Sequence, residues 1–464
     1  MDRDRRTVIH GRWILTRSDK AHQIIENHFI LVEGTKIVSI THDQPQEADE
    51  TIDLDQAFIL PGFLNLHNHC FSAPLFRGIT DDLSEGTFRG NIIYSLLMPM
   101  GALAVETLNE EELRAVIKMT ILELLKTGTT TVLDVWRLNQ AIFLDVAKEM
   151  GIRAYGCPYL FSTPDLGIGA DGLPTYGKRP DGDTGFNQTV ELFHKYDEGP
   201  HGRVRVGFGP HGVDSCDPEL LRTIKQASKE LGCPVAIHLA QSRPEIDLIR
   251  HRYGKTPIEH LRDLEFLGPN VLTAHCVYAT DTDLKILRDS GATLVTCPHT
   301  FARSGTTARF DRFLSSGVRV AIGTDGYVMD MLMELMVAGI IAKTSAGRGD
   351  VAIASDLITA STKAGADALG RSDLGVIEPG AKADLVVVDM CKSHLQPVMD
   401  PLRNLIWRGS SADINTVLVD GEILVRDRKL SREDEKPIIT RATSAIEKVW
   451  RKAVDVGLLK TNQL

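Results

Sequence analysis

The sequence Pro-Gly-Phe-Leu-Asn-Leu-His-Asn-His, residues 61–69, contains an apolar segment that ends on two histidines. Phe63–His69 is typical of a short β-strand that is mostly buried. His67 and His69 lie two residues apart at its end, and the side chains of a strand alternate between its two faces. Both imidazoles therefore point in the same direction, so this stretch predicts a strand that presents two histidines from its C-terminal end.

Strand-like and helix-like patterns alternate through the residues that follow this strand. Parallel strands need helical crossovers, and eight of them close a ring, so the pattern predicts an α/β fold with a (β/α)8 barrel of the TIM type. The alternative is an open doubly wound sheet, which calls for a glycine-rich phosphate loop that opens a helix. The one Gly-x-Gly-x-x-Gly match, at residues 167–172, is followed by Leu-Pro-Thr-Tyr-Gly, and this context disfavours a nucleotide site. The predicted strands are Phe63–His69, Thr129–Val135, Arg153–Leu160, Val204–His211, Pro234–Ala240, Val271–Cys276, Thr293–Pro298 and Val318–Asp325. The predicted helices are Asn109–Lys126, Pro218–Leu231, Thr282–Asp289 and Met329–Lys343.

Two β-rich pieces lie at opposite ends of the chain. Residues 1–60 and 376–430 are rich in strand-forming residues, with turns at Glu33-Gly34 and Asp420-Gly421. We expect them to pair into one small β-sandwich domain, with the barrel of residues 61–375 inserted between them. Residues 431–464 are expected to form a helical extension whose helix spans Ala442–Val456.

Two long segments, residues 70–105 and 161–185, interrupt the regular spacing of the barrel. Both follow the C-terminal end of a predicted strand, where the active sites of barrels lie. Long loops of this kind commonly form lids or pocket walls, although surface elaboration is an alternative for the second.

The composition narrows the classes of partner. With 52 Lys and Arg against 62 Asp and Glu, the formal net charge is −10, which disfavours nucleic acid as a partner. The chain has no apolar run of membrane-spanning length and no secretory signal at its start. Its seven cysteines are scattered without a Cys-x-x-Cys pair, as expected for reduced thiols in the cytoplasm. We therefore expect a cytoplasmic homo-oligomer that acts on a small-molecule substrate, with no membrane and no nucleic acid as partner.

Further polar residues lie at the ends of the later predicted strands. His211 ends the fourth, His238 lies at the end of the fifth, His275 ends the sixth and Asp325 ends the eighth. The C-terminal ends of the strands of a barrel meet at one mouth, where these side chains would join His67. Neutral imidazoles together with a carboxylate are ligands expected of Zn, Fe or Co. The constellation therefore predicts a metal site at the barrel mouth.

The motifs around these residues resemble the amidohydrolase superfamily, most closely its triazine hydrolase and cytosine/guanine/adenosine deaminase-like branch. Residues 375–389 resemble the family's return into its small β domain. The segment at 69–78 is similar to hydrolases of phenylurea herbicides and of the thiocarbamate molinate. The motifs that carry the wider resemblance are Pro-Gly-Phe-Leu-Asn-Leu-His-Asn-His (61–69), Gly-Pro-His (209–211), Ile-His-Leu-Ala (237–240), Thr-Ala-His-Cys-Val (273–277) and Gly-Thr-Asp-Gly (323–326).

The resemblance implies a set of roles for these residues. No lysine ends the fourth strand, so one divalent ion (Zn, Co, Fe or Mn) per subunit is expected. His275 matches a residue that orients the hydrolytic water or supplies a further ligand, and His211 matches a residue that contacts substrate. The ligands that the resemblance implies are His67, His69, His238 and Asp325.

One position departs from the pattern of the family. Deaminases of this branch usually carry a glutamate three residues after the fifth-strand histidine, and this chain has Gln241 there. An amide does not titrate, so Gln241 cannot act as a general acid or base. Glu245, one helical turn further on, is an alternative acid. The change makes deamination of a ring less favoured and direct hydrolysis at an acyl carbon more favoured.

The favoured hypothesis is a metal-dependent hydrolase that cleaves a C–N or C–S bond at the carbonyl of a small amide, urea, carbamate or thiocarbamate. Such a substrate would include xenobiotics such as herbicides, so the chain is expected in xenobiotic degradation. Asp325 would accept the proton of the attacking water, and His275 would polarise the carbonyl. The alternatives are an aminohydrolase of a purine, pyrimidine or triazine ring, and a non-catalytic scaffold. Expected substrate contacts are His211, Gln241, His299, Arg303 and Phe76, with a structural ion pair as the alternative for Arg303.

Overall fold

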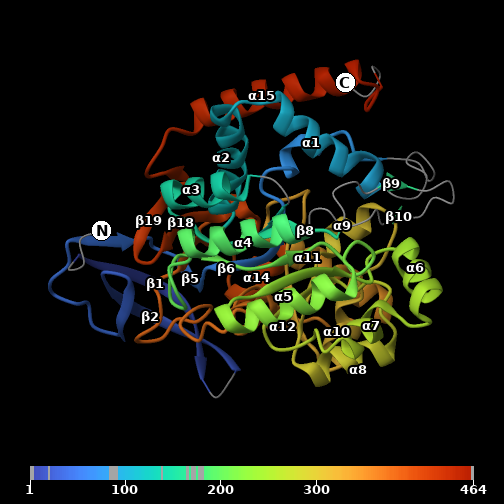
Figure 1. Cartoon of the computed structure of the whole chain (residues 1–464). Helices are drawn as coiled ribbons and strands as arrows, with labels where there is room; N and C mark the ends of the chain where they lie inside the picture. Colours follow the sequence, from blue (N-terminus) through green and yellow to red (C-terminus); the bar gives the residue numbers. More distant parts are fainter. Residues whose placement is uncertain are drawn as a thin grey trace.

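The computed structural model describes residues 5–18, 21–82, 92–136, 139–162, 167–168, 174–175 and 182–460. A barrel and a smaller sheet make up the molecule, and the C-terminal helix lies across one side of the barrel (Figure 1). Residues 83–91 of the long segment 70–105, and most of segment 161–185, lie outside the described residues.

The barrel is a ring of parallel strands, and each of the eight predicted strands has a counterpart in it. Two parallel sheets, β6-β7-β8-β11 with β12 beside β8, and β13-β14-β15-β16, form most of the wall. Bridges between Phe208 and Val235 and between Asn68 and Asp325 join the two sheets. The predicted (β/α)8 barrel is therefore confirmed. Its strands are β6 (Phe63–Asn68), β7 (Thr129–Trp136), β8 (Arg153–Leu160), β11 (Val204–Val206), β12 (Gly209–Pro210), β13 (Val235–Leu239), β14 (Val271–His275), β15 (Thr293–Thr296) and β16 (Arg319–Ile322).

The fourth strand differs from its prediction, because it is broken into β11 and β12. A side chain at Gly207 would place its first carbon 2.5 Å from the Pro234 carbonyl oxygen, and one at Gly209 would lie 2.4 Å from the Cys157 carbonyl oxygen. The neighbouring backbones approach too closely here for a regular strand with side chains. His211 follows the break, and its backbone N–H donates to the Leu160 carbonyl at 3.0 Å.

Helices surround the ring, and capping residues mark where several of them begin and end. The carboxylate of Asp217 accepts the backbone N–H groups of Glu219 and Leu220, which begins α5, and Gly232 ends that helix at φ 63°. Asn109 and Glu112 form a capping box at the start of α2. The helices are α1 (Met98–Thr107), α2 (Glu110–Lys126), α3 (Gln140–Met150), α4 (Gly182–Tyr196), α5 (Pro218–Leu231), α6 (Arg243–Tyr253), α7 (Pro257–Asp263), α8 (Asp281–Ser290), α9 (Pro298–Arg303), α10 (Phe310–Ser315), α11 (Met331–Ala346), α12 (Ala354–Ser361), α13 (Lys363–Ala368), α14 (Pro401–Arg408) and α15 (Glu435–Asp455).

The β-rich ends of the chain pair with each other in one connected sheet of nine strands. The N-terminal strand β5 and the C-terminal strand β17 are antiparallel neighbours, and Leu385 lies opposite Pro61. The predicted turns are present, with positive φ at Gly34, Asp420 and Gly421. One face of the sheet has its own apolar cluster, which includes Ile9 and Ile30. The strands are β1 (Arg6–Ser18), β2 (Ala21–Glu33), β3 (Lys36–Thr41), β4 (Glu50–Asp53), β5 (Ala57–Pro61), β17 (Leu385–Asp389), β18 (Ile414–Val419), β19 (Glu422–Arg426) and β20 (Lys429–Leu430).

The C-terminal helix α15 starts earlier than predicted, because Asp434 caps it and accepts the backbone N–H of Lys436 at 3.1 Å. It packs against α1, α2 and the short helix η1 (Ala73–Phe76). The indole N–H of Trp450 donates to the Leu75 carbonyl oxygen at 2.7 Å. The helix therefore supports the segment that follows the first barrel strand. No helix in the described part of the chain is both long and apolar enough to span a bilayer.

Candidate metal centre and active site

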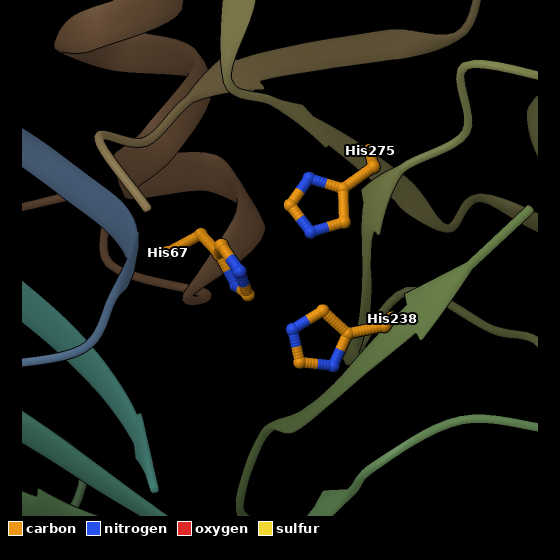
Figure 2. A group of neighbouring side chains, drawn as sticks. All are labelled: His67, His238 and His275. Carbon is orange, nitrogen blue, oxygen red and sulfur yellow. The ribbon is translucent and has the colours of Figure 1, made fainter. Parts of the chain in front are cut away.

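Four histidines and one aspartate lie together at the C-terminal mouth of the barrel, and all five side chains are buried. One ligand atom of each of His67, His238 and His275 lies within 4.8 Å of the other two, and the same holds for His67, His69 and Asp325. Figure 2 shows the imidazole rings of His67, His238 and His275 turned toward a common space between the strands. The barrel thus brings together residues that are far apart in the sequence.

Asp325 lies closest to His69 among these groups. Its Oδ1 is 3.0 Å from His69 Nε2 and 3.9 Å from His67 Nε2, and its Oδ2 is 4.0 Å from His275 Nε2. The backbone N–H of Asp325 donates to the His67 carbonyl at 2.9 Å, which fixes the eighth strand against the first. Asp325 and His275 have φ values of 59° and 78°, a region that residues other than glycine rarely adopt. Such strain is concentrated at functional sites.

Backbone carbonyls set the tautomers of two histidines. His69 Nδ1 lies 2.7 Å from the Val135 carbonyl oxygen, and His238 Nδ1 lies 2.8 Å from the His211 carbonyl oxygen. Each Nδ1 must donate to its carbonyl, so the Nε2 of each ring carries a lone pair when that ring is neutral. Without a metal ion, burial alone would lower the pKa of His69, but the hydrogen bond to Asp325 outweighs burial and raises this pKa. The buried Nε2 of His67 has no hydrogen-bond partner in the part of the chain that the structure describes.

The ionisation of the cluster fits a divalent cation. Burial lowers the pKa of His67 and of His238 well below the usual range, and it lowers the pKa of His275 to about 4, so these rings are neutral at neutral pH. Burial alone would raise the pKa of Asp325, but the hydrogen bond from His69 and the nearby histidines outweigh it and hold this pKa well below its usual range. Neutral imidazoles and an ionised carboxylate are the donors that one zinc-type ion takes. The cluster is therefore a binding group for one divalent metal ion.

A cavity of about 310 Å³ opens above the cluster. His69, His238, His275 and Asp325 form its polar floor. Aromatic side chains make up much of its wall, and this shape suits a flat, largely apolar molecule. The aromatic lining residues are Phe76, Trp136, Tyr159, Phe301 and Tyr327.

Four of the five residues expected to contact substrate line this cavity: Phe76, His211, Gln241 and Arg303. His211 Nδ1 lies 2.9 Å from Ser215 Oγ. The Arg303 guanidinium pairs with Asp81 and lies 4.0 Å from the centre of the Tyr327 ring, so its charge is already compensated within the wall.

His299 is the expected contact that the structure places elsewhere. It lines a separate surface cavity that shares Phe76, Arg303 and Tyr327 with the main one. The backbone N–H of His299 donates to the buried carboxylate of Glu334 at 3.1 Å. This contact lies in the first turn of α9, and His299 is absent from the described lining of the main cavity.

Glu245, the alternative acid, does not line the cavity. One of its carboxylate oxygens accepts the backbone N–H of Ala240 and the other accepts that of Gln241, both at 2.8 Å. Glu245 therefore supports the turn that carries Gln241, and its geometry does not favour the role of a substitute acid.

Sequence reasoning missed four aromatic residues of the cavity wall: Phe301 in α9, and three residues at or just after the ends of barrel strands. Trp136 and Tyr159 lie at the ends of the second and third barrel strands, and Tyr327 follows the eighth. The Tyr159 hydroxyl lies 3.3 Å from His238 Nε2. Their position at strand ends is the signal that could have found them, since the histidines were recognised by the same criterion.

Known proteins are similar to this chain in sequence and in structure. A model of the amidohydrolase family matches residues 58–424. The 5'-deoxyadenosine deaminase of Methanosarcina mazei is 29% identical over 95% of this chain and 98% of its own. The 5-methylthioadenosine/S-adenosylhomocysteine deaminase of Thermococcus sibiricus is 32% identical over 85% of this chain and 89% of its own. Among solved structures, one that is similar is atrazine chlorohydrolase TrzN from Arthrobacter aurescens, complexed with zinc. It superposes on this chain with a TM-score of 0.84 and 25% sequence identity, and the match covers 95% of this chain and 100% of the chlorohydrolase. None of these three is a phenylurea or thiocarbamate hydrolase, so that finer resemblance is not supported.

Proposed function

The chain belongs to the amidohydrolase family, and on that premise we propose that it is a metal-dependent aminohydrolase that releases ammonia from a purine, pyrimidine or triazine ring. The observation that carries the proposal is the His and Asp cluster at the floor of an aromatic-walled cavity. Relatives that match nearly the whole chain are named as deaminases of adenosine-type compounds. The proposal replaces hydrolysis of a urea or thiocarbamate as the leading hypothesis.

The residues present fit one divalent ion. We assign His67, His69, His238 and Asp325 to hold it, because their donor atoms lie close together and one of them, His67 Nε2, is buried without a partner among the described residues. An ion bound there supplies a Lewis acid that lowers the pKa of water from about 15.7 towards about 7. Zinc is present in the structure of the similar chlorohydrolase.

The other steps belong to the side chains of this chain. Asp325 accepts a proton from the attacking water and returns it to the departing amine, so that water and the ring amine yield a ring carbonyl and ammonia. His275, 4.0 Å from Asp325 Oδ2, holds the water and the developing oxyanion in place. Gln241 donates a hydrogen bond from its amide to a ring nitrogen, and the aromatic wall stacks on the ring.

A second candidate is hydrolysis of an acyl C–N or C–S bond. Gln241 is the observation that favours it, because an amide cannot deliver a proton to a ring nitrogen. An acyl carbon needs less assistance at that position. Glu245 does not repair the loss, since backbone N–H groups occupy both of its carboxylate oxygens.

The two candidates are separated by the product that the zinc-loaded enzyme releases. We suggest a panel of adenosine, 5'-deoxyadenosine, 5'-methylthioadenosine, atrazine, a phenylurea and a thiocarbamate. The proposal predicts ammonia from a ring compound, a loss of more than about 10³-fold in Asp325→Asn, and less than about tenfold in Gln241→Ala. Asp350→Asn, which alters an exposed pair with Arg348, is the matched control. Release of an amine or thiol from the acyl compounds, without ammonia from any ring, would establish the second candidate.

A further inference from the structure

The hydroxyl group of Tyr159 has no task in the mechanism above, although it lies beside the metal-binding group. We propose that Tyr159 is a catalytic residue whose hydroxyl donates a hydrogen bond to the substrate atom on which negative charge develops. The inference rests on the proposed hydrolytic function and deepens it. It assigns to this site a hydrogen-bond donor that the sequence did not predict.

Tyr159 is held in one position from several sides. It is the penultimate residue of β8, its side chain is buried, and it lines the cavity. Its ring packs edge-on against His211, with centroids 5.0 Å apart, and lies 5.9 Å from the ring of Trp136. A donor fixed in this way needs no reorganisation when charge develops on the substrate.

The hydrogen bonds around Tyr159 show why its proton becomes available. The hydroxyl lies 3.4 Å from His69 Nδ1 and 3.3 Å from His238 Nε2. His69 Nδ1 already donates to the Val135 carbonyl and cannot accept. His238 Nε2 carries a lone pair and is the acceptor, but at a length that marks a weak bond.

That one acceptor is the atom that we assign to the metal ion. Once the lone pair of His238 Nε2 is engaged by a cation, the Tyr159 hydroxyl no longer has an acceptor in His238 or His69. A buried donor without a partner is costly. The hydroxyl already lines the cavity, so a substrate atom is the partner that the site offers.

The cavity needs such a donor because Gln241 replaces an acid. Among the described lining residues, the carboxyl groups belong to Asp82, which is exposed, and to Asp325, which acts on the water. A tyrosine hydroxyl keeps its proton at neutral pH, since its ordinary pKa is about 10. Tyr159 thus complements Gln241 on a substrate whose charge would otherwise be stabilised by an amide alone.

The test compares Tyr159→Phe with Tyr155→Phe. Tyr155 lies on the same strand toward the opposite end of the barrel, where its buried hydroxyl lies 3.4 Å from an Arg371 nitrogen. With the panel compound that the wild type turns over, Tyr159→Phe is expected to lower kcat by about 10²-fold or more and to leave KM nearly unchanged, whereas Tyr155→Phe changes neither. Zinc affinity, measured by competition with a chelator, is expected to be equal or up to about tenfold tighter in Tyr159→Phe, because a competing hydrogen bond to His238 is gone.

Two results would overturn the assignment. An unchanged kcat in Tyr159→Phe shows that the hydroxyl does not contact the reacting atoms. A 10- to 100-fold weaker affinity for zinc shows that Tyr159 orients a ligand histidine, since a loss of that size is typical of groups that support metal ligands. If the wild type turns over no compound of the panel, the proposed function fails, and the zinc titration still decides the role of Tyr159 by the same criterion.

Discussion

The two ends of the barrel bury ionisable side chains equally well. They differ in whether the polar atoms of Arg153 at one end, and of two histidines at the other, have hydrogen-bond partners. At the N-terminal end, the guanidinium of Arg153 donates to both carboxylate oxygens of Asp384 at 2.9 Å and to Asp420 at 2.7 Å. At the C-terminal end, the buried atoms His67 Nε2 and His275 Nδ1 have no hydrogen-bond partner among the described residues. Arg153 is fully buried, and both histidines are 2% exposed.

The difference separates a structural network from a binding site. Buried polar groups are nearly always paired, so a buried atom without a partner calls for an explanation such as an unseen ion. Asp384 lies just before β17 and Asp420 lies in the turn between β18 and β19, so the Arg153 network joins the barrel to the nine-stranded sheet. We infer that the paired end holds the two parts together and that the unpaired end is completed by a metal ion.

The largest expected effect comes from His67→Ala at the unpaired end. The change removes a nitrogen that we assign to the ion, so zinc content should fall from one per chain toward zero. Turnover should fall by more than about 10⁴-fold, because water loses the activation that lowers its pKa. Elemental analysis and steady-state kinetics on the same preparations measure both.

His394→Ala is the matched control for this change, because the Nε2 of His394 already pairs with Asp413 at 2.9 Å. It should retain zinc and turnover. If the wild-type chain bound no metal and His67→Ala altered stability alone, the non-catalytic scaffold would become the better interpretation.

At the paired end, Arg153→Met should lower the free energy of unfolding by about 3–5 kcal/mol. The substitution leaves the carboxylates of Asp384 and Asp420 buried without their main partner, and breaking a buried pair from one side costs about that much. Zinc content should stay at one per chain, because Arg153 is at the far end of the barrel from the cluster. Urea denaturation of the two proteins, followed by circular dichroism, gives the difference.

Arg348→Met serves as the control for this prediction, because Arg348 pairs with Asp350 on the surface, with side chains 61% and 68% exposed. Exposed pairs contribute about 0–1 kcal/mol. An equally small loss in Arg153→Met would mean that the network does not hold the sheet to the barrel.

Local patterns made most of the fold predictable. The eight strands, the helices α2 and α5 and the turn at Asp420-Gly421 depend on residues close together in the sequence, and the structure contains them. The break in the fourth strand could not be predicted in this way. It depends on how closely the Pro234 carbonyl approaches Gly207, which is a contact between two strands.

The site was predictable where rare residue types lie at strand ends. His67 and Asp325 stand out because an imidazole or a carboxylate at such a position needs a reason. Tyr159 and Trp136 occupy equivalent positions, but an aromatic residue in a strand is as easily part of the core. His299 was assigned to the main cavity from its place after the seventh strand, and the short helix α9 carries it to a neighbouring cavity instead.

The smallest expected effect per measured step is a change in how steeply stability depends on pH, and it distinguishes the two ends in protein freed of metal. At the C-terminal end, burial lowers the pKa of His211 to about 3, against 6.5 for an unperturbed histidine. The unfolded chain therefore binds more protons below pH 6.5, so the free energy of unfolding should fall by about 1.4 kcal/mol per pH unit between 6.5 and 4 for this residue. At the other end, burial alone would raise the pKa of Asp373, but the Arg371 ion pair outweighs it and lowers the pKa to about 2. That contribution is present above pH 3.8 and is lost only as the pH falls toward 2. His211→Gln should make the first phase of a urea-unfolding pH series shallower without abolishing it, because burial also lowers the pKa of His67, His238 and His275. Asp373→Asn should flatten the second phase, and a change of the first phase by Asp373→Asn would show that the two ends do not titrate independently.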